Sequence, residues 1–140
     1  MKAFQPNETS RIDRVRVVSR LALGFVWLDE GLVPKLLFVR PDQIELVRNS
    51  GFSFGAPELT LHAMGVAQAA CGLWLLIGVA ERAAAAVVTA WMCVLIVLVA
   101  RGNPLMLTDP YGALVKDLCL IACAYTVWTL SAEKSASRSA

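Results

Sequence analysis

The chain has 140 residues, which is enough for one domain and too few for two. Apolar residues make up 57% of it and charged residues 17%, whereas soluble domains have about 45 to 50% and about 25%. The net charge is only +2 and the basic residues form no stripe, which argues against a nucleic-acid partner. We therefore expect a single all-α membrane domain over residues 1–140, with the lipid bilayer as a partner.

The chain begins with a polar stretch, residues 1–12, which lacks apolar periodicity and predicts a mobile arm. The first expected membrane span, residues 15–38, contains five charged residues: Arg16, Arg20, Asp29, Glu30 and Lys35. A cleaved signal peptide is not expected, because Asp29 and Glu30 stand where its small-residue cleavage site belongs. A charge at the centre of a lone membrane helix costs about 2.5 to 3.5 kcal/mol, so this span must turn its charges into a bundle.

Between the first and second spans, a short segment opens with Pro41 and closes with Gly51. It is too short to cross a membrane and predicts a short extracytoplasmic interfacial helix. Residues 59–80 and 83–100 then carry no formal charge and have about the 18 to 22 residues that cross a hydrocarbon core. Only two residues separate these spans, so we expect antiparallel neighbours joined by a tight turn.

The fourth expected span, residues 111–130, follows a helix start signal in which Asp109 can cap and Pro110 suits the first helical position. The serine-rich residues 131–140 predict a disordered tail. For the first and fourth spans, which contain charges, an amphipathic surface helix stays open as the alternative.

Basic residues at both ends of the chain argue that the first and fourth spans cross the membrane instead of lying on its surface. Four crossings bring both ends to the side of Arg82, where most of the basic loop residues then gather. The positive-inside rule assigns that side to the cytoplasm. We therefore expect a four-transmembrane-helix bundle in a bacterial inner (cytoplasmic) membrane, with both termini cytoplasmic.

Polar side chains of three spans gather toward the extracytoplasmic side of the bundle. They are Asp29, Glu30, Lys35, Glu58, His62, Gln68, Lys116 and Asp117. Ionisable residues inside a membrane are a hypothesis for a ligand-binding site, because an uncompensated charge in a low dielectric is expensive. The same pairing would arise if the charges only locked the helices together, and both interpretations stay open. No arrangement for catalysis is found among them.

Three helix faces repeat small or polar residues every three or four positions, which predicts that these faces meet inside the bundle. They comprise Gly24, Leu28, Gly31 and Lys35; Glu58, His62, Gly65, Ala69 and Gly72; and Gly112, Lys116, Cys119, Cys123 and Thr126. His62 is the only histidine and the cysteines form no CxxC pair, so no metal site is expected. The four cysteines are interpreted as small core residues, and the four tryptophans as bilayer-facing or interfacial residues.

Three short motifs, in order, resemble DoxX-like membrane proteins. Residues 31–36, Gly-Leu-Val-Pro-Lys-Leu, resemble the glycine-to-lysine signature at the end of their first span. Residues 68–78 are similar to their second-helix pattern, and residues 109–112 with Lys116 to the opening of their fourth helix. Two positions depart from the pattern: Gln68 stands where a glutamate is usual, and Asp117 where many relatives have asparagine. The first departure puts proton handling at that position in doubt.

The resemblance covers about residues 15–130 and implies a four-helix membrane protein associated with redox systems. It leads us to expect an accessory or quinone-interacting subunit of a membrane oxidoreductase assembly, with a quinone as the ligand and no covalently bound cofactor. Since no residue supplies redox chemistry by itself, activity of the chain alone is not expected. Two alternatives stay open: a small proton-coupled transporter working as a homo-oligomer, and a non-catalytic structural or assembly protein.

Overall fold

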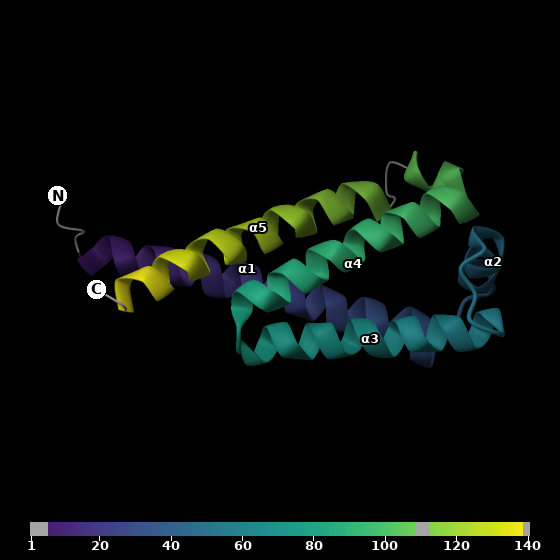
Figure 1. Cartoon of the computed structure of the whole chain (residues 1–140), viewed down its shortest axis with the longest axis horizontal. Coiled ribbons are helices and arrows are strands. Elements are labelled where there is room, and N and C mark those ends of the chain that lie inside the picture. Colours follow the sequence, from purple (N-terminus) through teal and green to yellow (C-terminus); the bar gives the residue numbers. More distant parts are fainter. Residues whose placement is uncertain (1–5, 109–112, 139–140) are drawn as a thin grey trace.

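The computed structural model describes the backbone of residues 6–108 and 113–138 and the side chains of residues 10–108 and 114–131. Over these ranges the chain is all-α, with four long helices and one short helix (Figure 1). The helices are α1 (Pro6–Leu32), α2 (Pro41–Ser50), α3 (Pro57–Ile77), α4 (Glu81–Gly102) and α5 (Ala113–Arg138). A π-helical turn η1 (Val33–Leu37) extends α1, and a 3-10 turn η2 (Pro104–Leu107) follows α4.

The four long helices form one bundle whose hydrophobic core lies between α1, α3, α4 and α5. α1 packs against α3 and α5, and α4 packs against α5. The start of α1 and the end of α5 lie at the same end of the bundle, and α2 lies across the opposite end, between α3 and α4 (Figure 1). The four-helix architecture and the short connecting helix predicted from the sequence are thus confirmed.

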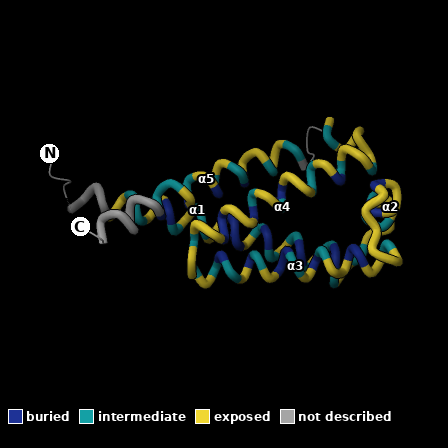
Figure 2. The backbone as a smooth tube through the Cα atoms, viewed as in Figure 1, coloured by how far each residue is buried: buried dark blue, intermediate teal, exposed yellow. Residues whose placement is uncertain are grey.

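The membrane character of the bundle follows from its outer surface. Three described helical stretches are long and apolar enough to cross a membrane: Pro57–Ile77, Glu81–Gly102 and Leu114–Ser131. Only 28% of the α4 stretch is buried inside the bundle, so most of a strongly apolar helix faces outward (Figure 2). Contact with lipid removes this apolar surface from water. The fourth long helix, α1, carries more charge, and several of its charged groups turn into the bundle as expected.

The contact between α1 and α3 depends on glycines. A Cβ added at Gly31 would lie 2.6 Å from the backbone oxygen of Gly65 and 2.6 Å from the backbone nitrogen of Ala69. A Cβ added at Gly72 would lie 2.6 Å from the backbone nitrogen of Leu28. Since the neighbouring atoms are backbone, neither helix can give way by turning a side chain. The predicted meeting of these two glycine faces is confirmed.

The two chain ends differ from the prediction. α1 begins at Pro6 instead of following a polar arm, and α5 continues to Arg138 instead of ending near residue 130. Polar residues continue a helix readily once packing has fixed its adjoining turns. Here Arg16 fixes α1 and Ser131 fixes α5, because both contact Glu81. The capping role predicted for Asp109 and Pro110 lies outside the described residues.

Two predictions about buried faces were wrong. The buried residues of α5 are Leu120, Ala124, Val127 and Ser131, a stripe rotated by one residue from the predicted one, and Cys119 is exposed. Trp27 faces the core and is only 2% exposed, whereas a bilayer-facing position was expected. The cysteines are all free, as expected, although Cys93 and Cys119 are exposed on the bundle surface instead of lying in the core.

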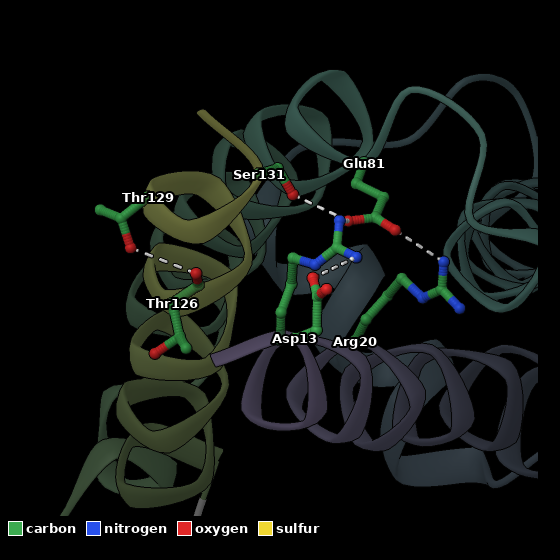
Figure 3. Close-up of polar contacts among 7 residues, drawn as sticks. Asp13, Arg20, Glu81, Thr126, Thr129 and Ser131 are labelled. Carbon is green, nitrogen blue, oxygen red and sulfur yellow. Dashed lines mark hydrogen bonds and ion pairs between the residues drawn. The ribbon is translucent and has the colours of Figure 1, made fainter. Parts of the chain in front are cut away.

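The end of the bundle at the α3–α4 turn is held by a cluster of charged residues around Glu81, the first residue of α4. Arg16 and Arg20 of α1 donate to its two carboxylate oxygens at 2.9 and 2.8 Å. Ser131 of α5 donates to Glu81 Oε2 at 2.8 Å, and Asp13 pairs with Arg16 at 3.1 Å (Figure 3). This cluster, called the Glu81 cluster below, joins three of the four long helices.

Candidate ligand-binding pocket

The opposite half of the bundle encloses a cavity of about 420 Å³. Its walls come from α1, α3, α4 and α5, and α2 contributes the residues at its outer end. The walls are largely apolar, with Trp27, Leu61, Met92 and Leu120 among the lining residues. Volumes of about 300 to 1,000 Å³, apolar walls and a few convergent polar groups are typical of small-molecule sites.

Glu30 is the charged centre of this pocket and is bound by two lysines. Lys116 of α5 donates to Glu30 Oε1 at 2.5 Å. The ammonium of Lys35 lies 3.8 Å from Glu30 Oε2 and donates to the backbone oxygen of Glu30 at 2.8 Å. With Asp117 also in the lining, α1, η1 and α5 bring two cations and two carboxylates together.

The position of Lys35 follows from the proline before it. Pro34 has no N–H, so it cannot donate to the carbonyl of Glu30 four residues earlier in the helix. The Lys35 ammonium donates to this carbonyl instead. The helix continues over Val33–Leu37 as a π-helical turn, closed by a bond of 2.8 Å from the Phe38 amide to the Val33 carbonyl. Lys35 is buried as a result, with its side chain 9% exposed.

Gln68 lies on the α3 wall and is 4% exposed. Within the described residues its Oε1 atom is buried without a hydrogen-bond partner. The same is true of Oε1 of Gln43, which reaches the pocket from α2. Both oxygens are covered by protein atoms, so they are uncompensated buried acceptors of a kind that native proteins rarely keep.

Helix α2 supplies the outer rim of the pocket. It begins at Pro41 and ends at Gly51, whose φ of 73° gives the left-handed conformation that favours glycine at a helix end. Arg40, directly before α2, pairs with Asp42 through two bonds of 3.1 and 2.9 Å, and both residues line the pocket. Leu46 packs so closely on the end of α4 that a Cβ at Gly102 would lie 2.5 Å from its backbone oxygen.

The structure brings five of the eight candidate residues to this pocket: Glu30, Lys35, Gln68, Lys116 and Asp117. The other three lie outside it. Asp29, Glu58 and His62 are exposed on the outer surface of α1 and α3, and His62 Nδ1 lies 2.7 Å from the backbone oxygen of Glu58. The expected common cluster of all eight residues is therefore not formed.

Gln43, Arg40 and Asp42 are pocket residues that the sequence analysis did not single out. The sequence does carry a signal for them, because the predicted start of α2 at Pro41 fixes their place at the first turn of a helix that cannot span the membrane. The sequence does not show that this first turn of α2 faces the pocket, because its orientation depends on the packing of α2 against α3 and α4.

Among the side chains of residues 10–108 and 114–131, no group of three or more histidine, cysteine, aspartate or glutamate residues is placed to hold a metal ion. The polar groups of the pocket are instead suited to hydrogen bonding with an uncharged or anionic oxygen.

Long apolar helices with outward-facing hydrophobic side chains, and with charged groups turned inward, define a multi-pass membrane protein. The sequence model of the DoxX-like family matches residues 24–125, which include every residue lining the pocket. The match covers more than half of the chain, and the chain belongs to the DoxX-like family. No curated protein and no solved structure matches it.

Proposed function

We propose that this DoxX-like protein is an accessory subunit of a membrane redox assembly and that its pocket binds the headgroup of a quinone. The observation that carries the proposal is the cavity of about 420 Å³, whose lining combines apolar walls with two lysines, Lys35 and Lys116, and two glutamines, Gln43 and Gln68. A quinone has the same combination: a flat apolar ring with polar oxygens at its edge. Its apolar tail would extend between helices into the lipid.

The lysines provide the binding chemistry. An ammonium group has three donors, and the described contacts of Lys35 and Lys116 all go to Glu30. Each lysine therefore keeps donors for a ligand oxygen, and Glu30 balances part of their charge. Trp27 contributes to the apolar wall of the same cavity.

A redox partner is proposed because quinone chemistry requires a protein that carries the electrons, and the resemblance to DoxX-like proteins implies such an association. Asp29 supports such a partner. It is exposed on α1 between Phe25 and Val33, which are exposed one turn away on either side. A carboxylate facing lipid is costly, and a neighbouring membrane subunit with a donor or a cation at this depth would remove the cost.

The proposed orientation has the Glu81 cluster toward the cytoplasm and α2 on the opposite side. The Glu81 end carries exposed Arg11, Arg14 and Arg82, together with the buried Arg16 and the half-buried Arg20. Among the described residues, the α2 end carries three arginines, Arg40, Arg48 and Arg101, and the two lysines of that half, Lys35 and Lys116, lie at the pocket. The excess of arginine at the first end supports a cytoplasmic location under the positive-inside rule. The pocket would then open toward the outer leaflet of a bacterial inner membrane.

The test is purification of the chain from native membranes in a mild detergent, followed by mass spectrometry of extracted quinones and copurifying subunits. Wild type should retain a quinone and an oxidoreductase subunit, and Lys35→Ala and Lys116→Ala should lose the quinone while keeping the helical circular dichroism spectrum. Asp29→Asn should lose the subunit and keep the quinone. Arg48→Ala is the matched control, because Arg48 is an exposed cation of α2 outside the pocket lining. A wild-type protein that emerges empty and alone overturns the proposal.

A structural role is the second candidate, and the bridging of both lysines by Glu30 favours it. If these charges only lock α1 to α5, Lys35→Ala and Lys116→Ala will lower the unfolding temperature without changing the bound quinone. The same purification therefore separates the two functions.

A further inference from the structure

A second hollow lies on the outer surface of the bundle and shares no lining residue with the pocket. It is an open groove of about 450 Å³ between α4 and α5, which pack side by side (Figure 1). The Thr89 hydroxyl in it donates back to the Ala85 carbonyl of its own helix at 2.8 Å, so the groove presents a mainly apolar surface. The lining residues are Ala86, Thr89 and Ala90 of α4 and Ile121, Ala124, Tyr125 and Trp128 of α5.

The groove opens toward lipid. Ala86 and Ala90 are exposed, as are Tyr125 and Trp128 across from them, and both helices have apolar stretches long enough to cross a membrane. From Arg82, at the start of α4, to Ala90 the helix rises by about 12 Å. This is less than half of a hydrocarbon core about 30 Å thick. A molecule in the groove therefore lies within one leaflet, the one at the Glu81 end of the bundle.

A cation stands at the end of the groove. Arg82 is exposed one helical turn before Ala86, and its guanidinium lies 4.7 Å from the centre of the Trp128 ring. Within the described residues Arg82 forms no ion pair, whereas the nearby Arg16 and Arg20 both bind Glu81. A guanidinium stacked on an aromatic ring keeps the N–H donors at its edge for an oxyanion.

We propose that this groove binds an anionic phospholipid, with one acyl chain between α4 and α5 and the phosphate on Arg82. Phosphate oxygens match the fork of guanidinium donors, and basic sites beside membrane helices attract anionic headgroups. A zwitterionic headgroup brings its own cation close to Arg82 and offsets part of this attraction. The site is separate from the pocket, so it does not depend on the ligand that the pocket binds.

Charge favours a lipid over a second copy of the chain as the occupant. Copies with the same orientation in the membrane would pair about a twofold axis, which places the same face of each against the other. The two Arg82 side chains would then stand at the same depth, and like charges near lipid repel strongly. An anionic headgroup instead neutralises the cation.

The test is native mass spectrometry of the full-length protein, released from a neutral detergent and titrated with phosphatidylglycerol and phosphatidylcholine of identical acyl chains. Wild type should bind phosphatidylglycerol about tenfold more tightly, which corresponds to one hydrogen bond between charged groups. Arg82→Gln should abolish this preference. Arg14→Gln is the matched control and should keep it, because Arg14 is an exposed arginine of α1 at the same end, outside the groove lining. Equal binding of both lipids by wild type, or equal loss of preference in both variants, overturns the proposal.

Ala90→Leu tests the acyl-chain part of the site. The larger side chain fills the groove from an exposed position, so it should weaken binding of both lipids without lowering the unfolding temperature. Ala100→Leu adds the same volume at an exposed position of α4 outside the groove and should change neither. Lipid binding that is unchanged in Ala90→Leu overturns the proposal. A wild-type dimer, detected by light scattering, that Ala90→Leu separates into monomers also overturns it, because a second copy would then occupy the groove.

Discussion

The two halves of the bundle each hold a glutamate between two cations, and they differ in what surrounds it. Glu81 is bound by Arg16 and Arg20, and the three side chains are 12%, 7% and 15% exposed. Glu30 is bound by two lysines, and its own side chain is 34% exposed beside a cavity. Arginine presents a rigid fork of donors, whereas lysine is a flexible point charge with donors to spare. The comparison indicates that the Glu81 cluster closes the bundle and the Glu30 site leaves room for a ligand.

Glu81→Gln is expected to give the largest loss of stability. It leaves two nearly buried arginines without their carboxylate, which for buried pairs costs about 3 to 5 kcal/mol. Thermal unfolding in detergent, followed by circular dichroism, measures the change. Glu45→Gln is the control, because Glu45 is exposed on α2. An unfolding temperature equal to that of wild type would contradict the closing role of the cluster.

Gly31→Ala is expected to give the second-largest loss of stability, and it acts on the half of the bundle that contains the pocket. The new methyl would lie 2.6 Å from backbone atoms of α3, and overpacking of this kind costs about 1 to 3 kcal/mol. Because Lys35 follows Gly31 by one helical turn, ligand affinity should fall together with the unfolding temperature. Ala70→Val adds volume at an exposed position of α3 and should leave both unchanged. If Gly31→Ala leaves the unfolding temperature and the ligand affinity unchanged, as Ala70→Val should, the close contact of α1 and α3 is not required for stability or for the pocket.

Glu30→Gln is the direct counterpart of Glu81→Gln and should cost less, about 1 kcal/mol, since the pair is partly exposed to its surroundings. It frees both lysines from their carboxylate. We expect Glu30→Gln to change the amount of bound quinone clearly while lowering the unfolding temperature only slightly. Quinone extraction and thermal unfolding on the same preparation measure the two effects. Equal losses of stability in the two variants would remove the proposed distinction between the halves.

Lys116→Met should have the smallest effect on stability, about 0.5 kcal/mol, because the lysine side chain is 42% exposed and methionine replaces its apolar stem. Ligand affinity should nevertheless fall, because a donor for the ring oxygen is lost. Calorimetric titration of the detergent-solubilised protein with a decyl-substituted benzoquinone measures the affinity. An unchanged affinity would show that Lys116 only holds Glu30.

The sequence predicts much of the fold because its signals are local. Pro41 and Gly51 bound α2, and glycines one or two turns apart identify the faces by which α1 and α3 meet. For α5 the same approach selected the wrong stripe. Apolar residues surround this helix on nearly every side, so small-residue spacing cannot distinguish its buried face from a face rotated by one position.

The pocket was only partly predictable. Charged residues such as Glu30, Lys35 and Lys116 stand out in apolar spans, and the expectation that they pair follows from the cost of an isolated charge. Gln43 does not stand out, because a glutamine in a polar connector is unremarkable until the helix around it is docked. The opposite orientations of Asp29 and Glu30, which are adjacent in sequence, depend on how α1 is rotated in the bundle. No local pattern fixes that rotation.

The Glu81 cluster also bears on the order in which the helices assemble. Glu81 is separated by 65 residues from Arg16 and by 50 from Ser131, so a growing chain makes the arginines long before their carboxylate. A helix with two unneutralised arginines is costly to move into lipid. The complete cluster can therefore form only after the first turn of α4 has been made, and Ser131 of α5 joins it last.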